Sequence, residues 1–405
     1  MKIAIIADDL TSATDTSIQF TRSGYSAEVV FYDQLALKSE VDVVAVDTNS
    51  RAQSAAEAQR RTRVTARGLK DSPIIYKTVD STLRGHLGLE LSALLQETEH
   101  KTAIIAPAFP LCGRTTQDGA QLLHGRLVHE TEFAFDPANP VISSQIASLL
   151  QSPDLAPVMM LSRKEIRDPN RVQGAIASAR CVVVDSETQD DLRALVQAVA
   201  DLSTVCWVGS PGLARALADQ LPRLQSQPAV QPQACKRVLI VVGSLNPVTR
   251  AQLKHLLSQK NTVSLTVQPS RVVGGRAARD RIVQQMEEHF RLGHTVVLCS
   301  PDKPVRSEGN HDAGDAVRSL AEVACRAITE QFADGLVVTG GATAEAVLRR
   351  AGITGLRLEN EVTPGIPTAK AVHPHELRIV TKAGGFGSEN ALLESYSALT
   401  AGGSN

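Results

Sequence analysis

The chain alternates short apolar runs with longer stretches in which leucine and alanine recur at helical spacing. The apolar runs are rich in valine and isoleucine and lack polar alternation, which is typical of parallel strands covered on both faces. We expect strands at 3–7, 41–46, 74–77, 103–106, 181–184, 205–208, 238–242, 295–298, 336–338 and 377–380. Segments between them, such as 85–96, 190–202 and 342–351, have the spacing of helices. The alternation predicts an α/β architecture with right-handed crossovers.

One stretch has neither pattern. Residues 222–236 read PRLQSQPAVQPQACK and contain three prolines and four glutamines without an apolar period. Such a composition is typical of an interdomain linker. We therefore expect an N-terminal domain at 1–225 and a C-terminal domain at 236–405, each with a mainly parallel sheet covered by helices. A cleft between two such domains commonly holds a ligand, and we expect one here.

Composition and charge argue against several classes of protein. Apolar residues make up 43% and charged residues 21% of the chain, which is not the composition of a disordered protein. The 42 basic and 43 acidic residues nearly cancel and aromatic residues are 3%, so we expect no binding to nucleic acid or to a membrane. The six cysteines form no CxxC pair, and no apolar run has the length of a signal sequence or a membrane span. The expected location is the reducing cytoplasm.

Three predicted strands of the first domain end in polar residues. Asp8 and Asp9 follow the first strand, Arg51 follows the second, and the third runs into KTVDSTLRGH at 77–86. Ligands of open parallel sheets bind outside the carboxyl ends of the strands. Asp8 and Asp9 are therefore candidates for holding a hydroxylated substrate or a metal, and Arg51 can fork onto a carboxylate. A helix cap at Asp9 and a surface position for Arg51 are the structural alternatives.

The third of these segments has the highest density of polar groups. Lys77 and Arg84 supply positive charge, and Asp80 can accept a proton or a substrate hydroxyl. Hydroxyl groups and free backbone N–H groups at the start of the following helix favour an anion. In the structural alternative, Ser81 or Thr82 is only a helix cap and His86 an ordinary helix residue. The loop at 107–116 can fold over the same face. Together these groups suit a small, hydroxylated, anionic substrate such as a sugar acid.

Three turns after strands of the second domain contain glycine. They read GSLN at 243–246, TGGATA at 339–344 and TKAGGFG at 381–387. Glycine lets the backbone approach a phosphate and helix N-termini supply N–H groups, so three such turns predict a polyphosphate cradle. Each alone is also consistent with a simple tight turn. The sequence contains neither a P-loop GxxxxGK[ST] nor a Rossmann GxGxxG with its acidic partner.

Taken in order, these segments resemble the four-carbon acid sugar kinases, a family that includes 3-oxo-tetronate, D-threonate and D-erythronate kinases. The resemblance is carried by IADDLTSATD at 6–15, DTNSR at 47–51, KTVDSTLRGH at 77–86, GRTT at 113–116, DPANPV at 136–141, VGSPGLA at 208–214, VVGSLNPVT at 241–249, VTGGATA at 338–344, PGIP at 364–367 and TKAGGFG at 381–387. It covers nearly the whole chain. One departure is Ser12, where the family usually has glycine.

The resemblance implies a sugar-acid domain followed by an ATP domain, and phosphorylation of the 4-hydroxyl of the acid with ATP and Mg²⁺. The residues that would bind the acid are Asp9, Arg51, Ser81, Thr82, Leu83 and Arg84. Those that would bind ATP are Ser244, Gly340, Gly341, Ala342, Thr343, Gly384 and Gly387. Asp9 or Asp80 would accept the proton of the hydroxyl. No metal ligands are indicated.

Two other functions remain open on the sequence alone. A sugar-acid dehydrogenase or isomerase would place a nucleotide cofactor at the glycine turns, but the dinucleotide fingerprint is absent. A non-catalytic sugar-acid-binding protein would use the two domains as a clamp, but the sequence shows no DNA-binding motif to deliver an output. The sequence does not determine which four-carbon acid is used or the oligomeric state, and a homo-oligomer is among the expectations.

Overall fold

A computed structural model describes residues 3–34, 40–136, 139–224, 233–259, 261–268, 275–301 and 313–401. The chain divides into two compact units, Met1–Gln227 and Pro228–Asn405. Most of the predicted linker, at 225–232, lies outside the described residues. Each unit contains a mainly parallel array of strands with helices on its faces, so the predicted α/β class is confirmed.

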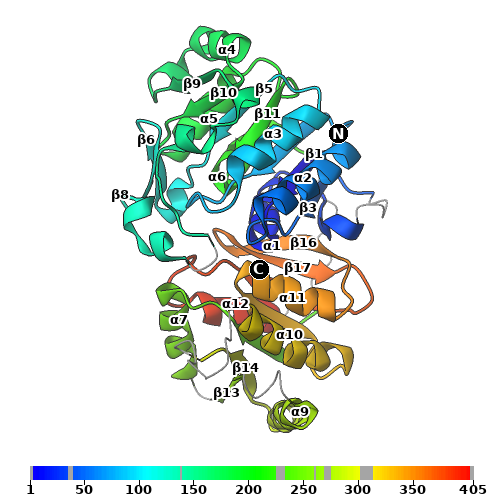
Figure 1. The fold of residues 1–405 in the computed structure, drawn as a ribbon. Helices are drawn as coiled ribbons and strands as arrows, with labels where there is room; N and C mark the ends of the chain where they lie inside the picture. Colours follow the sequence, from blue (N-terminus) through cyan, green and yellow to red (C-terminus); the bar gives the residue numbers. More distant parts are fainter. Residues whose placement is uncertain are drawn as a thin grey trace. The chain divides into compact units, whose positions relative to one another are not determined.

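The strands of the first unit lie side by side in the order β2-β3-β1-β4-β11-β5-β10-β9 (Figure 1). Every neighbouring pair is parallel. The bounds are β1 Ile3–Ala7, β2 Ala27–Phe31, β3 Val43–Asp47, β4 Ile74–Thr78, β5 Thr102–Ala106, β9 Val158–Leu161, β10 Cys181–Val184 and β11 Val205–Gly209. A small antiparallel sheet adds β6 Arg114–Gln117, β7 Ala120–Leu123 and β8 Arg126–Leu127.

The helices of the first unit form two groups. Helix α6 packs between α1 and α5, with α4 beside α5, while α2 packs against α3. Their bounds are α1 Leu10–Thr21, α2 Ala55–Leu69, α3 Leu87–Glu97, α4 Pro169–Ser178, α5 Gln189–Ala198 and α6 Pro211–Gln220. Local sequence signals explain several starts: Thr188 and Asp191 form a capping box at α5, and Ser210 caps α6 just before Pro211.

The strand order of the first unit reverses at β1. After β1 the chain builds β2 and β3 on one side and then crosses to β4 on the other side. Such a reversal leaves a crevice at the carboxyl ends of the central strands, which is where open α/β sheets bind ligands. The polar residues that follow β1, β3 and β4 therefore meet at one place.

The second unit repeats this principle with different strands. Its order is β13-β14-β12-β15-β18-β17-β16, parallel from β13 to β18 and antiparallel from β18 to β16. The bounds are β12 Val238–Val242, β13 Thr262–Thr266, β14 Thr295–Cys299, β15 Gly335–Thr339, β16 Gly355–Thr363, β17 Ile366–Ala371 and β18 Arg378–Lys382. Here the order reverses between β12 and β15, so the turns that follow these two strands are neighbours.

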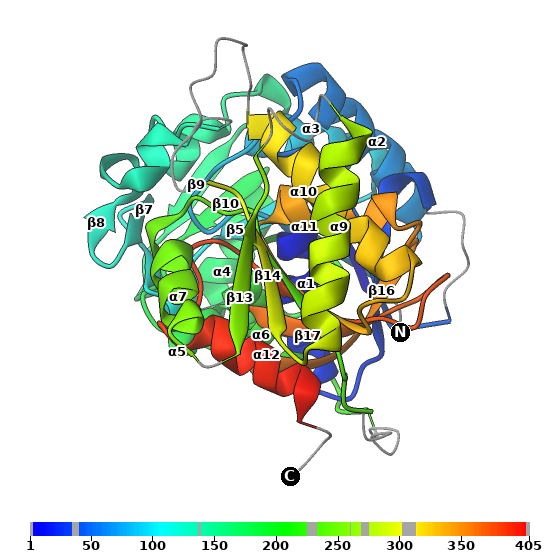
Figure 2. The same cartoon turned by 90° about the horizontal axis from the view of Figure 1, so that it is seen from below.

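Two groups of helices cover the sheet of the second unit, as Figure 2 shows. Helices α9, α10 and α11 pack in sequence, and α7 packs against α12. Their bounds are α7 Pro247–Leu257, α9 Arg276–Arg291, α10 Ala313–Thr329, α11 Gly341–Arg350 and α12 Ala391–Thr400. None of the helices within the described ranges has both the length and the apolarity needed to span a membrane.

The predicted strands are confirmed to within about two residues. Strand β9, VMML, is apolar throughout and was nevertheless not predicted, whereas three further strands that were missed share a physical reason. Strand β13 is only partly buried, and β16 and β17 form an antiparallel pair whose sequences alternate with polar residues. Such strands carry no continuous apolar run, which is the signal on which the prediction depended. Strand β2, AEVVF, was missed because its charged Glu28 interrupts the run, yet Glu28 is buried.

Candidate functional site

The carboxyl ends of β1 and β3 are joined by a network of charged hydrogen bonds. Arg51 donates to both carboxylate oxygens of Asp8, from Nε at 2.7 Å and from Nη2 at 2.9 Å. Its Nη1 donates to Asp9 Oδ2 at 2.7 Å, and its Nη2 also donates to Ser12 Oγ at 2.7 Å. All three nitrogens of the guanidinium are therefore engaged, so the alternative of a free surface arginine is wrong.

Asp9 also caps helix α1. Its Oδ1 accepts the Ser12 N–H at 2.7 Å, and its backbone is extended as a cap residue requires. The capping role and the ion pair with Arg51 coexist on one carboxylate. Burial alone would raise the pKa of the neighbouring Asp8, but the Arg51 charge and hydrogen bonds hold that pKa below its usual value. Asp8 is therefore held ionised by Arg51.

The segment after β4 forms a second charged cluster. Asp80 Oδ2 accepts hydrogen bonds from Thr82 Oγ1 at 2.7 Å and from Arg84 Nε at 2.5 Å. Burial would raise the pKa of Asp80, but Arg84, Arg51 and the hydrogen bonds lower it well below the usual range. Arg84 also donates from Nη1 to Asp136 at 3.1 Å and stacks over the ring of Phe133, 5.0 Å from its centroid.

The turn that carries these groups lies against the Arg51 network. Leu83 has a left-handed backbone with φ +62° and Gly85 has φ +96°. A Cβ atom on Gly85 would lie 3.3 Å from Asp8 Oδ2 and 3.7 Å from Arg51 Cγ, so only glycine fits easily there. The residues that the sequence analysis selected after β1, β3 and β4 are therefore brought together. A left-handed conformation at a bulky residue such as Leu83 is uncommon and concentrates at functional sites.

A buried ion pair between β4 and α3 lies next to this cluster. Lys77, in β4, lies 2.8 Å from Glu90 of α3, and the two side chains are 1% and 2% exposed. Ser50 donates a hydrogen bond to Glu90, and Thr48 donates to the carbonyl of Ala7 at 2.7 Å. Glu90 was not predicted as part of the site, because a glutamate in a helix carries no local sign of burial. Asp136 was not predicted either, since it lies 52 residues away from Arg84 in the sequence.

The loop at 107–116 joins the same cluster. Gln121, in β7, donates to the carbonyl of Ser81 at 2.8 Å and accepts from Thr116 Oγ1 at 2.8 Å. Arg114 is 4% exposed, and burial lowers its pKa, while Asp80 and Arg84 are among the charges that act on it. The prediction that this loop folds over the strand ends is consistent with these contacts.

The glycine turns of the second unit converge. A Cβ atom on Gly243 would lie 2.1 Å from Thr343 Oγ1, and one on Gly384 would lie 2.5 Å from Ser244 Oγ. Gly340, with φ +87°, has Ser244 and Thr343 as its nearest neighbours. The turns after β12, β15 and β18 therefore pack together. Gly243 and Gly384 leave no room for a side chain where another turn approaches, whereas Gly340 is favoured by its positive φ and not by crowding.

Helix α11 begins at this point. Gly340 is its N-cap and provides no side-chain hydrogen bond, so the first N–H groups of α11 are not capped in that way. Gly341, Ala342 and Thr343 form its first turn, and that turn contains no acidic residue. Uncapped N–H groups and the helix dipole together favour an anion, in particular a phosphate.

Gly387 has a different environment. A Cβ atom at Gly387 would lie 2.4 Å from Cβ of Ala391 and 3.0 Å from Ile366 Cδ1, and its φ is +85°. Packing against α12 and β17 therefore accounts for this glycine. Its predicted contact with ATP stays a prediction.

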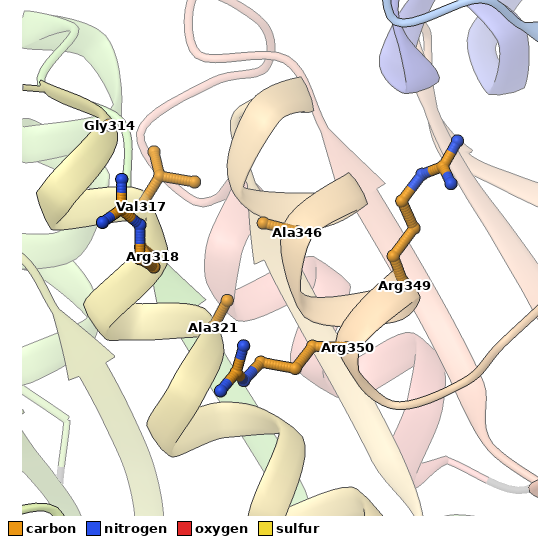
Figure 3. Close-up of a pocket in the computed structure, with 7 residues that line it drawn as sticks. All are labelled: Gly314, Val317, Arg318, Ala321, Ala346, Arg349 and Arg350. Atoms are coloured by element: carbon orange, nitrogen blue, oxygen red, sulfur yellow. The ribbon is translucent and has the colours of Figure 1, made fainter.

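A cavity of about 460 Å³ in the second unit lies between α10 and α11, as Figure 3 shows. It is lined by Gly314, Val317, Arg318, Ala321, Ala346, Arg349 and Arg350. Arg318 lies 3.4 Å from Asp315 and Arg350 lies 3.2 Å from Glu322, so both cations have acidic partners. None of the predicted ATP-binding residues lines this cavity. Among the described residues no group of three or more His, Cys, Asp and Glu side chains has the arrangement of a metal site.

Two family models match the two halves of the chain. A sugar-binding N-terminal domain matches residues 3–217, and a nucleotide-binding C-terminal domain matches residues 239–392. Each site described above lies within the corresponding match. By family, the chain therefore combines a sugar-binding N-terminal domain with a nucleotide-binding C-terminal domain.

Relatives with assigned activities align over the full chain. A D-threonate kinase from Cupriavidus necator is 35% identical and covers 99% of this chain and 98% of its own. A D-threonate kinase from Salmonella typhimurium is 30% identical and covers 97% of both chains. Relatives named D-erythronate kinase and 3-oxo-tetronate kinase also align over nearly the whole chain. A Haemophilus influenzae crystal structure has the same fold, with a TM-score of 0.73 at 21% identity over 98% of this chain and 100% of its own.

These matches show that the chain belongs to the four-carbon acid sugar kinase family, as the sequence motifs predicted.

Proposed function

We propose that this protein is an ATP-dependent kinase that phosphorylates the 4-hydroxyl of a four-carbon sugar acid, with D-threonate as the first candidate. The observation that carries the proposal is a pair of sites at strand-order reversals. One is a cluster of cations, carboxylates and hydroxyls at the ends of β1, β3 and β4. The other is the glycine cradle at the ends of β12, β15 and β18. The D-threonate kinases at 30% and 35% identity favour that acid.

Arg84 is the residue best suited to bind the carboxylate of the acid. Its Nε and Nη1 are engaged by Asp80 and Asp136, whereas its Nη2 has no hydrogen-bond partner in the described part of the chain. A guanidinium held in this way is pre-oriented and retains N–H donors for an anion. All nitrogens of Arg51 are engaged by protein groups, so we assign Arg51 the role of orienting Asp8 and Asp9.

The glycine cradle fits the phosphates of ATP. Gly340 has a positive φ and only ordinary contacts with Ser244, Gly384 packs tightly against Ser244, and the first turn of α11 offers N–H donors. Mg²⁺ would neutralise charge on the phosphate oxygens, which it commonly binds together with water rather than through a protein cage. Phosphoryl transfer depends mainly on such positioning and charge neutralisation.

Asp9 and Asp80 are the two carboxylates proposed to accept the hydroxyl proton. Asp80 is held by Arg84 and Thr82 and has a lowered pKa, which suits a positioning group better than a base. We therefore expect Asp9→Asn to depress kcat with little change in the affinity for ATP. Asp80→Asn should instead raise KM for the acid, because Arg84 loses its partner. The opposite assignment of the two effects would identify Asp80 as the base.

The direct test is ADP release by the purified protein. We expect ADP release with ATP, Mg²⁺ and one member of a panel of D-threonate, L-threonate, D-erythronate and 3-oxo-tetronates, and phosphate on the terminal oxygen of the product. If no member of the panel stimulates ADP release, the kinase proposal is wrong for this chain. Binding of an acid without turnover would indicate the non-catalytic alternative, and NAD-dependent oxidation of an acid would indicate the dehydrogenase alternative.

A further inference from the structure

Lys382 is a fully buried cation at the carboxyl end of β18. Its side chain has no exposed surface, and its Nζ donates to the carbonyls of Ala383 and Phe386 at 3.0 Å and to Thr249 Oγ1 at 3.2 Å. In the described part of the chain no carboxylate lies within ion-pair distance of this ammonium. Neutral oxygens alone therefore surround a positive charge.

Such an arrangement is unfavourable for the charged form of lysine. Removing an ammonium from water is costly, and carbonyl dipoles offset only part of that cost when no counter-ion is present. Burial accordingly lowers the pKa of Lys382 to about 7. The groups that face it from α7 are Thr249 and Gln252, and no charged side chain of β15, β17, α11 or α12 among the described residues acts on its pKa.

The ammonium is part of the framework of the glycine cradle. The Ala383 and Gly384 carbonyls that it approaches belong to the turn whose glycine contacts Ser244. Thr249 donates to the Gly384 carbonyl at 2.7 Å, and the Gly340 N–H donates to the Lys382 carbonyl at 2.9 Å. The residue thus connects two of the three turns that form the cradle.

We propose that Lys382 is a positioning residue whose ammonium supplies the counter-charge for the nucleotide phosphates, so that nucleotide binding and protonation of Lys382 are linked. This inference rests on the proposed nucleotide site. A polyanion in the cradle stabilises the charged form of the lysine, and by linkage the charged form binds the polyanion more tightly.

The linkage has a defined sign. A lysine that is partly neutral in the free protein and charged in the complex takes up a proton on binding. Affinity should therefore fall as the pH rises above 7, by up to about tenfold per pH unit, because one proton is bound in the complex and absent from the free protein. A lysine that only stabilises the turn would give no proton uptake on nucleotide binding.

The test is calorimetric titration of the full chain with Mg²⁺ and ADP at pH 8 in buffers of different ionisation enthalpy. The dependence of the observed enthalpy on the buffer gives the number of protons taken up. We expect nearly one proton for the wild type. Lys382→Arg should bind ADP with no such uptake, because a guanidinium stays charged at this pH. Lys370→Met serves as the control, since Lys370 is an exposed lysine on β17, and it should match the wild type.

A second variant keeps the test decisive if substitution of Lys382 prevents folding. Thr249→Val removes one hydrogen bond to the ammonium at nearly constant volume, so the pH above which ADP affinity falls should move to a lower value. ADP binding without proton uptake in the wild type, or an unshifted pH profile in Thr249→Val, overturns the role of Lys382 and leaves the kinase proposal intact. Absence of ADP binding by the wild type overturns both.

Discussion

The two units each bury a lysine in a central strand, but among the described residues only the lysine of the first unit is paired with a carboxylate. Lys77 in β4 lies 2.8 Å from Glu90, which also accepts a hydrogen bond from Ser50. Lys382 in β18 has only carbonyl and hydroxyl oxygens as partners. The first charge is balanced within the protein, and the second is not.

The difference corresponds to how each unit would recognise its ligand. In the first unit, charged side chains hold one another in place, as Asp80 and Asp136 hold Arg84, and the ligand meets a pre-oriented group. In the second unit, backbone N–H groups at the glycine turns and an ammonium without a counter-ion among the described residues produce a positive potential. A bound phosphate would neutralise that potential. The comparison predicts that substitutions in the first unit act by leaving one partner of an ion pair unpaired. Substitutions in the second unit should act by blocking the approach of the nucleotide or by removing the positive charge that balances its phosphates.

The largest expected effect is on stability, from Lys77→Met. Removing one partner of a buried pair leaves Glu90 uncompensated, which typically costs about 3–5 kcal/mol. Urea unfolding followed by circular dichroism reports on both units, and the fluorescence of Trp207, the single tryptophan, reports on the first because β11 pairs with β4. Lys382→Met should destabilise the protein less, because no carboxylate is left unpaired. A double variant with Glu90→Leu should recover part of the loss, and equal effects of the two lysine variants would contradict the comparison.

A comparable loss, in substrate binding, is expected from Arg84→Ala. Truncating one partner of a buried charge-assisted contact costs about 2–5 kcal/mol, and we expect the lower part of that range because the Arg84 side chain is 23% exposed; Asp80 would also lose its partner. We expect a large rise in KM for the acid with unchanged affinity for ADP. Arg84→Lys should recover only part of the effect, because an ammonium cannot fork onto a carboxylate. The same KM for all three proteins would remove Arg84 from the site.

Gly384→Val should damage nucleotide binding by at least about tenfold, or roughly 1.4 kcal/mol, while acid binding is retained. The Cβ atom of the valine would lie 2.5 Å from Ser244 Oγ, so the side chain would displace Ser244 from its place in the cradle. Gly174→Val in α4 is the matched control, since nothing lies within 4 Å of its Cβ position. Calorimetric binding of ADP and of the acid should be measured together with the thermal stability. A folded variant with normal ADP affinity would show that this glycine serves only the turn.

The smallest expected effect is from Ser12→Ala. Its hydroxyl accepts one hydrogen bond from Arg51, which keeps its three contacts to Asp8 and Asp9. Loss of one such bond costs about 0.5–1.5 kcal/mol, so KM for the acid should rise by no more than about tenfold. An effect as large as that of Arg84→Ala would mean that Ser12 contacts the substrate directly.

Local sequence patterns predict most of the buried strands and indicate the strand ends that carry polar or glycine-rich residues. Continuous valine and isoleucine runs predicted most of the buried parallel strands, and the polar or glycine-rich residues after them indicated both candidate sites. The strand prediction succeeded because a strand and the turn that follows it are local features, so their signals lie within a few adjacent residues. The segments around the ends of β4 and β15 are examples, because KTVDSTLRGH and TGGATA can be recognised from the local sequence alone.

The hydrogen-bond and ion-pair partners of these groups are known only from the tertiary structure. Arg51 is engaged by carboxylates more than 40 residues away, Arg84 reaches Asp136, and Lys77 finds Glu90 only because α3 packs on β4. Lys382 lies in the sequence among ordinary strand residues, and the absence of a counter-ion is a property of its three-dimensional surroundings. Strand order and helix crossovers set these distances, and because they are non-local no short stretch of sequence encodes them.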